Sequence, residues 1–389
     1  MNGITRTLAR YASASRFEAL PAAVRHEGVR AFVNWVGCAA GAARDDGVQR
    51  ALEFLTEFNG AATSVVVGRR EKLDALNAAF INSMSSAALA FNDTHFTSVA
   101  HPTSPVAAAV LSMAQRQLVS GKDFIHALIL GVEIQCRVGN ILSVAPAECG
   151  VGLSMQGLVG GIGAAVAAGR ILGLDESGMA TAIGHAANQS GGLREAHATM
   201  ASYYIAGHAA RCGLAAALLA ARGYTCADSM LEGVKGFAVS YGSRPNLAAA
   251  VDKLGEAFEI LTLAYKPYPS GFVVHPVIDA CLDAARNHAI DARTIERIEL
   301  TVNPLALQLC NRPSPADSKQ ALVSFQHWAA VSLIYRAAGL AQVTAAVVHD
   351  PAVAELRRRI VATADAGLGR EAAIARIVLK DGRKLESGI

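Results

Sequence analysis

The chain has 389 residues, of which 52% are hydrophobic and 17% charged, so it is long enough for two domains and apolar enough for a large core. Its net charge of +3 comes from 35 basic and 32 acidic residues, a balance that argues against nucleic acid or a membrane surface as a partner. The seven cysteines show no CxxC spacing and the N-terminus has no apolar signal core, so we expect free thiols and a soluble cytoplasmic protein.

Residues 1–265 are expected to be mostly helical. The spacing of apolar residues predicts helices over 22–41, 72–90, 105–118, 121–138, 160–172, 176–187 and 206–221, with a short β-like run at 63–68. The first of these helices carries an apolar stripe, Val29, Phe32, Val33 and Val36. The glycine-rich stretch at 160–163 enters an alanine-rich helix, which favours close helix packing over phosphate binding.

The pattern changes at 265–271, where two prolines and a glycine interrupt it. Beyond this point we expect helices over 274–287, 318–338 and 351–359, and strands over 295–302 and 375–380, where apolar residues alternate. Because helices and strands are segregated along the chain, we predict a mainly α protein with a large all-helical domain at 1–265 and a smaller α+β domain at 266–389.

The most polar segment is FNDTHFTSVAHP at 91–102, between two apolar helices. Polar groups in such a place are costly unless they are paired or used. Two interpretations stay open at this point. Asn92 or Asp93 could cap the next helix, with Pro105 in its first turn. Alternatively the segment is a functional site, which accounts better for its two histidines, His95 and His101.

Familiar site signatures are missing from the sequence. No GxGxxG follows a strand, and no P-loop, HExxH or GxSxG motif occurs, so nucleotide, zinc-protease and serine-hydrolase sites are not predicted. Polar groups remain at glycine- or proline-rich junctions at 152–157, 191–197, 266–275 and 324–327. Taken singly, each is more typical of a structural role, and helical His185 and His208 are expected to be core histidines.

The order of these segments resembles the MmgE/PrpD (2-methylcitrate dehydratase) family, which includes cis-aconitate decarboxylase and iminodisuccinate epimerase. The matching pieces are FNDTH…HP at 91–102, GLSMQGLVGGIGAAVAAGRILGLD at 152–175, GHAANQSGGLREAHATM at 184–200, AGHAARCGLAAALLAARGYT at 206–225, KPYPSGFVVHPVIDA at 266–280 and SKQALVSFQHWAA at 318–330. The resemblance implies an α+β lid over the helical domain with the active site between them. It also implies no metal, no organic cofactor, a small di- or tricarboxylate substrate and a homodimer.

The resemblance also assigns candidate site residues. It implies three catalytic candidates, which are His101 as the base, Asp93 as its orienting partner, and His327 at a lid position where several relatives carry tyrosine and others histidine. The substrate-binding candidates that it implies are Asn92, Thr94, Ser154, Ser202, Tyr203, Lys266 and His275. Two of these depart from the family pattern, because Ser154 and Ser202 stand where relatives carry histidine and lysine.

The chemistry of that family is proton transfer at a carbon beside a carboxylate or imine. The resemblance therefore implies a cofactor-independent lyase of the dehydratase or decarboxylase type, with an epimerase as the alternative. Relatives continue past the last lid strand with helices that return to the main domain, and we expect no counterpart of these helices before Ile389. This difference, together with Ser154 and Ser202, favours a third alternative, a non-catalytic helical dimer, whereas Asp93, His101, Lys266 and His327 favour an enzyme.

Overall fold

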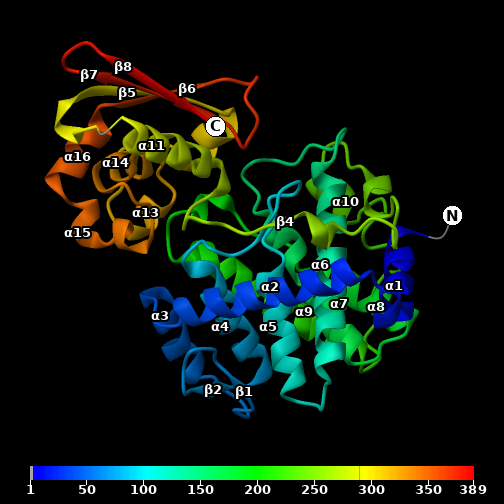
Figure 1. Cartoon of the computed structure of the whole chain (residues 1–389). Coiled ribbons are helices and arrows are strands. Elements are labelled where there is room, and N and C mark those ends of the chain that lie inside the picture. The colour runs from blue at the N-terminus through cyan, green and yellow to red at the C-terminus, as the bar shows by residue number, and fades with distance from the viewer. Residues whose placement is uncertain (1–2, 289) are drawn as a thin grey trace. The chain divides into compact units, whose positions relative to one another are not determined.

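The computed structural model describes residues 3–288 and 290–389, and the chain forms two compact units, Met1–Tyr265 and Lys266–Ile389 (Figure 1). The helices of the first unit are α1 (Ile4–Ala14), α2 (Ala22–Gly41), α3 (Asp46–Thr56), α4 (Ala75–Ala88), α5 (Thr103–Ala114), α6 (Gly121–Ser143), α7 (Met155–Ile171), α8 (Glu176–Ala187), α9 (Ala201–Ala220) and α10 (Phe237–Tyr241). Its strands form two short antiparallel pairs, β1 (Ser64–Val65) with β2 (Lys72–Leu73) and β3 (Thr94–His95) with β4 (Leu263–Ala264).

The second unit combines helices with a four-stranded sheet of order β6-β5-β7-β8, in which β5 and β6 are parallel and the other pairs antiparallel. Its elements are α11 (His275–Asn287), β5 (Ile295–Val302), α12 (Pro304–Cys310), α13 (Ser318–Leu322), α14 (Phe325–Tyr335), α15 (Ala345–Val348), α16 (Pro351–Arg358), β6 (Ile360–Ala364), β7 (Ala373–Leu379) and β8 (Lys384–Gly388). Helix α11 packs on β7 and β8, and α14 packs on α11 (Figure 1). The predicted mainly α fold with a smaller α+β part is confirmed.

Helix α7 lies at the centre of the first unit, against α5, α6, α8 and α9. Small residues permit these contacts. A Cβ atom added at Gly213 of α9 would lie 2.2 Å from the carbonyl oxygen of Gly161, and one at Gly131 of α6 would lie 2.6 Å from that of Gly163. Both helices therefore approach α7 more closely than alanine would allow, which confirms the packing role predicted for the glycines at 160–163.

The apolar stripe predicted on α2 is not its buried face. Val29, Val33 and Val36 are 47%, 64% and 37% exposed. The buried residues of this helix are instead Val24, Glu27, Gly28, Ala31, Trp35 and Ala39, and a Cβ atom at Gly28 would lie 2.6 Å from Cγ1 of Ile129 on α6. Large apolar residues are therefore found on both the buried and the exposed face, so their spacing alone did not identify the face that packs on α6.

Two predicted helices differ at their ends because a side chain caps the backbone. The helix expected at 72–90 begins at Ala75, since the Asp74 carboxylate accepts hydrogen bonds from the first-turn N–H groups. The helix expected at 318–338 is divided into α13 and α14, because Ser324 accepts a hydrogen bond from the N–H of His327 and starts a new helix. Strands β6 and β8 were not predicted.

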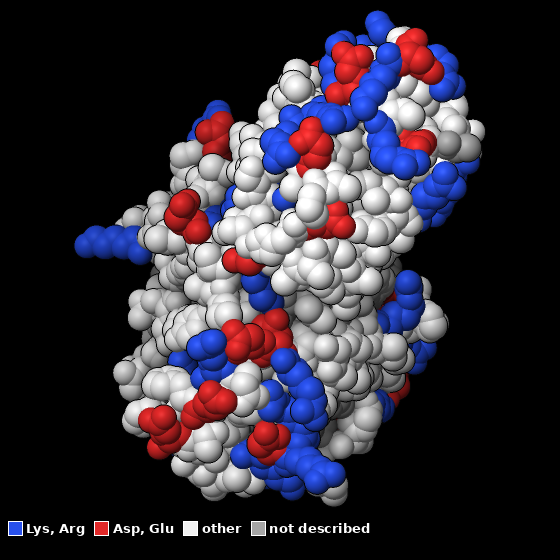
Figure 2. Space-filling view, turned by 90° about the vertical axis from the view of Figure 1, so that its left-hand side faces the viewer, with Lys and Arg blue, Asp and Glu red and all other residues white. Residues whose placement is uncertain are grey.

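Acidic and basic residues are intermixed on the face shown in Figure 2, so this face has no extended patch of one charge. Among the described residues one helix, α6, is long and apolar enough to cross a membrane, but 94% of its most apolar window is buried inside the chain. Such burial is typical of a core helix. All seven cysteines are free thiols.

Candidate functional site

The loop that follows α4 carries the polar segment and is fixed by short backbone contacts. Strand β3 pairs Thr94 with Ala264 and His95 with Leu263. The N–H of His95 donates to the carbonyl of Ala100 at 2.8 Å, which closes the loop on itself. Within the loop, Val99 has φ 57°, a left-handed conformation that is strained for a β-branched residue. The surrounding structure therefore holds this loop in an unfavourable backbone conformation.

His101, at the end of this loop, is half-buried and its ring orientation is defined by its neighbours. Its Nδ1 lies 2.7 Å from the carbonyl oxygen of Asp93 and 3.2 Å from Oγ1 of Thr94. Because a carbonyl oxygen can only accept, Nδ1 carries the hydrogen, and the lone pair of the neutral ring lies on Nε2. The backbone N–H of His101 donates to Oε1 of Gln156 at 2.8 Å. Nε2 is therefore the ring atom that can take up a proton.

The backbone carbonyl of Asp93 orients the ring of His101. The carboxylate is buried, and its Oδ2 accepts hydrogen bonds from Oγ1 and N of Thr103 at 2.7 and 3.4 Å. Thr103 is the first residue of α5, so the Asp93 side chain fixes the start of that helix. Asn92 contributes a longer contact, from Nδ2 to Oγ of Ser104 at 3.5 Å. The capping interpretation thus accounts for the Asp93 carboxylate.

The two histidines of the loop have different environments. His95 is completely buried, with Nδ1 2.7 Å from Oγ of Ser98 and Nε2 3.0 Å from Oε2 of Glu259. Oε1 of the same glutamate accepts from Nδ2 of Asn140 at 2.9 Å. The hydrogen bond from His95 is the main reason that the pKa of Glu259 lies below its ordinary value. His95 therefore ties the loop to the segment before β4, and a catalytic role for His101 stays a prediction.

A buried ion pair fixes that same segment. Nε of Arg137 lies 2.7 Å from Oε1 of Glu133 on α6, and both side chains are 1% exposed. The guanidinium also donates to the backbone carbonyls of Asp252 at 2.8 Å and of Ala257. Oε2 of Glu133 accepts from the N–H of Ile260 at 3.2 Å. Both members of the ion pair thus bind the backbone that leads into β4, Arg137 through carbonyl groups and Glu133 through an N–H group.

Ser154 lies next to α7, the helix whose residue Gln156 contacts the loop. Ser154 is the residue before α7, two positions ahead of Gln156, the acceptor for the His101 N–H. Its own N–H donates to the carbonyl of Gly192 at 3.1 Å. A Cβ atom at Gly157 would lie 1.9 Å from the carbonyl oxygen of Gly191, so glycine is required where the segments meet. The structure therefore places the glycine-rich segments at 152–157 and 191–194 side by side.

The hydroxyl groups of Ser202 and Tyr203 bind elsewhere in the first unit. Oγ of Ser202 donates to the carbonyl of Thr199 at 2.8 Å, within its own turn. The Tyr203 hydroxyl donates to Oδ1 of Asp45 at 2.7 Å, and burial raises the pKa of this buried phenol. The bond from Tyr203 to Asp45 joins the start of α9 to the start of α3. A substrate-binding role for either residue stays a prediction.

Three candidate residues lie in the second unit. Lys266 is its first residue, two positions after Ala264 of β4. His275 begins α11, and burial together with the charge of Lys266 lowers its pKa to about 4. Its ring lies edge-to-face with Tyr268 at a centroid distance of 5.4 Å. The convergence of Lys266, His275 and His327 with His101 stays a prediction.

His327 has both ring nitrogens engaged inside the second unit. It is completely buried, with Nε2 2.7 Å from the carbonyl oxygen of Gln342 and Nδ1 3.2 Å from Nη1 of Arg357. The carbonyl fixes the hydrogen on Nε2, so Nδ1 accepts from the guanidinium. Burial lowers the pKa of His327 to about 4. This environment is that of a structural histidine, so we leave His327 out of the proposed catalytic group.

The buried neutral histidine predicts a loss of stability in acid. An imidazole in the unfolded chain has a pKa of about 6.5, so between about pH 6.5 and 4 the unfolded state binds a proton that folded His327 does not. The free energy of unfolding should therefore fall as pH decreases through this window. His327→Gln keeps one donor and one acceptor without titrating, and chemical denaturation at a series of pH values should show a shallower fall. His349→Gln, at an exposed histidine of the same unit, should leave the slope unchanged, and equal slopes in wild type and His327→Gln would contradict the prediction.

The sequence interpretation missed two residues that contact the loop. Gln156 lies inside the segment at 152–157, and its polarity between glycines was a signal that could have identified it. Glu259 has no local signal, because it lies 164 positions from His95. Among the described residues, no group of three or more histidine, cysteine or carboxylate side chains could hold a metal ion.

Comparisons with known proteins cover both units. A family model described as the MmgE/PrpD N-terminal domain matches residues 6–249, and the MmgE/PrpD C-terminal domain matches residues 268–388. Cis-aconitate decarboxylase of Mus musculus is 28% identical over 80% of this chain and 65% of its own length. The Homo sapiens protein of the same name is 26% identical over 80% of this chain and 66% of its own length, and that of Aspergillus terreus is 28% identical over 72% and 59%. The chain thus spans less than two thirds of the length of these relatives.

Proposed function

Because the chain belongs to the MmgE/PrpD family, we propose that it is a lyase that acts on a small di- or tricarboxylate by moving a proton at a carbon beside a carboxylate. The observation that carries this proposal is the geometry of His101, whose protonated Nδ1 assigns proton exchange to Nε2. The names of the relatives favour lyase chemistry over epimerisation, since they are cis-aconitate decarboxylases.

His101 can serve either form of lyase reaction. In a decarboxylation the bond between the carboxylate and its carbon breaks, carbon dioxide leaves, and the electron pair remains on the carbon chain, where a neighbouring carboxylate stabilises it. The imidazolium of His101 then gives the proton on Nε2 to carbon. In a dehydration the neutral ring instead takes the C–H proton and hydroxide leaves. Either step gains from a proton carrier held in place before the substrate arrives.

The charge that develops on the substrate requires donors or cations. The N-terminus of α7 favours negative charge, and the second residue of this helix is Gln156, which binds the His101 backbone. We assign Lys266 to a substrate carboxylate, since it follows by two residues the Ala264 that pairs with Thr94. Ser154, at the same helix start, can donate a hydrogen bond but cannot supply the charge of the histidine found there in relatives.

Proton NMR in deuterated water tests this function. The native protein is incubated with cis-aconitate, citrate and succinate derivatives in turn. We expect one acid either to lose carbon dioxide and gain deuterium at the carbon that carried it, or to lose water, with deuterium entering the C–H position of the remaining acid where proton abstraction is reversible. Deuterium gain with inversion and no elimination would indicate the alternative epimerase. No exchange with any acid, from a folded protein, would favour the non-catalytic alternative.

Glu259 is proposed as a positioning residue for the His101 loop. Glu259→Gln removes the charge that holds His95 and should lower kcat by up to about 100-fold, because small displacements of catalytic groups can have effects of this size. KM should change little, since Glu259 does not bind substrate in this proposal. Glu256→Gln is the matched control, with the same charge change at a nearby exposed residue. A variant that loses stability but keeps kcat would restrict Glu259 to a structural role.

Two further features stay proposals. The homodimer and the cytoplasmic location expected from the sequence fit a family enzyme of this kind. Sedimentation velocity of the purified chain measures the first of them.

A further inference from the structure

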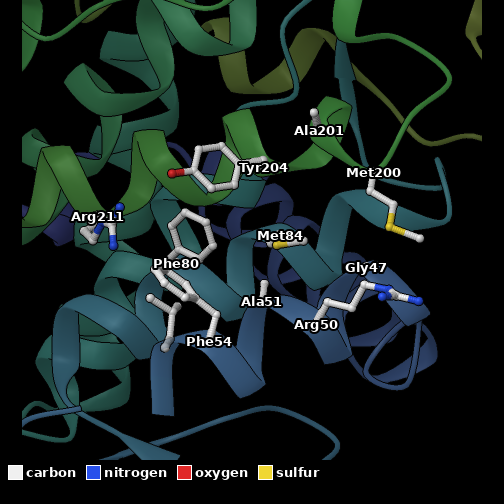
Figure 3. Close-up of a pocket in the computed structure, with 11 residues that line it drawn as sticks. Gly47, Arg50, Ala51, Phe54, Phe80, Met84, Met200, Ala201, Tyr204 and Arg211 are labelled. Carbon is white, nitrogen blue, oxygen red and sulfur yellow. The ribbon is translucent and has the colours of Figure 1, made fainter. Parts of the chain in front are cut away.

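A pocket of about 310 Å³ lies in the first unit between α3, α4 and α9 (Figure 3). Its lining combines aromatic and apolar side chains with two arginines, and it includes Arg50, Ala51, Phe54, Phe80, Tyr204 and Arg211. None of these residues belongs to the proposed catalytic group. The volume is at the lower end of the range of about 300–1,000 Å³ that is usual for small-molecule sites.

The walls of this pocket are mainly aromatic and apolar. The Tyr204 ring meets the Phe80 ring edge-to-face, with centroids 4.9 Å apart. Phe54 is 59% exposed, so a large apolar side chain stands at the opening. In Figure 3 Phe80 lies between Tyr204 and Phe54. Such walls stabilise a hydrocarbon or aryl group and cannot solvate several charges.

One of the two arginines in the lining has no acidic partner. The Cζ atom of Arg211 lies 4.8 Å from the centre of the Phe80 ring, and no carboxylate of the described residues is within 4.0 Å of its guanidinium. Arg50, by contrast, is paired with Asp46 at 3.0 Å. No acidic side chain lines the pocket. Arg211 is therefore a cation at the end of an apolar pocket, with a planar fork of donors that matches a carboxylate.

Gly47, the second residue of α3, leaves room for side chains from the start of α9 beside the pocket. A Cβ atom at Gly47 would lie 2.1 Å from the hydroxyl oxygen of Tyr203, whose hydrogen bond to Asp45 joins the two helices. The same added atom would lie 3.1 Å from Cγ of Met200. A side chain at Gly47 would therefore displace the Tyr203 hydroxyl and the Met200 side chain beside the pocket.

We propose that this pocket binds a compact apolar monocarboxylate, with the carboxylate on Arg211 and the hydrocarbon or aryl group against Phe54, Phe80, Met84 and Tyr204. A di- or tricarboxylate does not fit this chemistry, because the walls offer one unpaired cation and little else that is polar. The site is thus distinct in ligand class from the proposed active site, and it does not rest on the proposed function.

Isothermal titration calorimetry of the full chain tests the proposal with octanoate and 4-phenylbutyrate, each matched by its neutral primary amide. We expect the carboxylates to bind and the amides to bind at least about tenfold more weakly, because only the carboxylate forms charge-assisted bonds to Arg211. This comparison uses the unaltered protein, so it does not depend on the folding of a variant.

Three variants locate the binding. Arg211→Met keeps an apolar stem without the charge and should weaken octanoate binding by about tenfold or more. Arg222→Met is the matched control and should leave it unchanged, since Arg222 is exposed and does not line the pocket. Ala51→Trp fills the pocket and should abolish binding.

Three results would overturn the proposal. They are the absence of binding at millimolar concentration, equal binding of acid and amide, and unchanged binding by Arg211→Met. A dimer that Ala51→Trp dissociates in sedimentation velocity, with no binding of octanoate, would instead assign this face to a second copy of the chain.

Discussion

Replacing His101 with alanine should lower turnover by about 10²–10⁴-fold, the usual effect of removing a general acid or base. The reason is that Nε2 is the ring atom assigned to proton exchange, while Nδ1 is occupied by the Asp93 carbonyl. The rate of deuterium incorporation into the substrate, followed by NMR, measures the step directly. The exchange and the overall reaction should decrease together.

Thr94→Val is the matched control for that variant. It removes the longer contact to Nδ1, at 3.2 Å, and any bond from Thr94 to substrate, and it leaves the 2.7 Å bond to the Asp93 carbonyl. Turnover should therefore change far less than in His101→Ala. Exchange that survives in His101→Ala at the wild-type rate would keep the enzyme but assign the proton to another group.

Arg137→Met should lower the free energy of unfolding of the first unit by about 3–5 kcal/mol, because breaking a fully buried ion pair leaves an uncompensated charge. Glu133 would lose its cation, and the carbonyls of Asp252 and Ala257 would lose their donor. The chain has two tryptophans, Trp35 in the first unit and Trp328 in the second. Urea unfolding in a Trp328→Phe background, followed by fluorescence, therefore reports on the first unit.

Two comparisons separate the buried charge from lost packing. Adding Glu133→Leu to Arg137→Met removes both charges and should recover part of the stability. Arg50→Met breaks an exposed pair and should leave the transition unchanged within error. A single variant Arg137→Met that is as stable as the wild type would contradict the prediction.

Helices were predictable where local spacing decides them, as in α2, whose ends agree with the expected 22–41. Which face is buried was not, because close contact at Gly28 depends on α6, about a hundred residues later in the chain. Caps also escaped detection when they lay inside an apolar run, as Ser324 does between α13 and α14. The alternation that identified β5 is weaker in β6, an edge strand whose residues are mostly exposed or half-buried.

The sequence was sufficient to identify the segment that contains the candidate site, but not the contacts that its side chains make. The sequence contains two histidines six residues apart, and nothing local distinguishes them. The two histidines differ in their partners in the folded chain. Glu259 binds His95, whereas the Asp93 carbonyl orients His101. The role of the Asp93 backbone was not predictable either, since every residue offers the same carbonyl group. These contacts join residues that only the folded chain brings together.

The pairing of β3 with β4 has a consequence for how the protein is made. Residues 94–101 are synthesised in the first third of the chain, but the glutamate that holds His95 follows 164 positions later. At about 5–20 residues per second, a ribosome needs roughly 10–30 s to add that interval. During this time the nascent chain contains His101 without the strand that fixes its loop. A fragment that stops before Leu263 would carry the whole loop and still lack the strand that holds it.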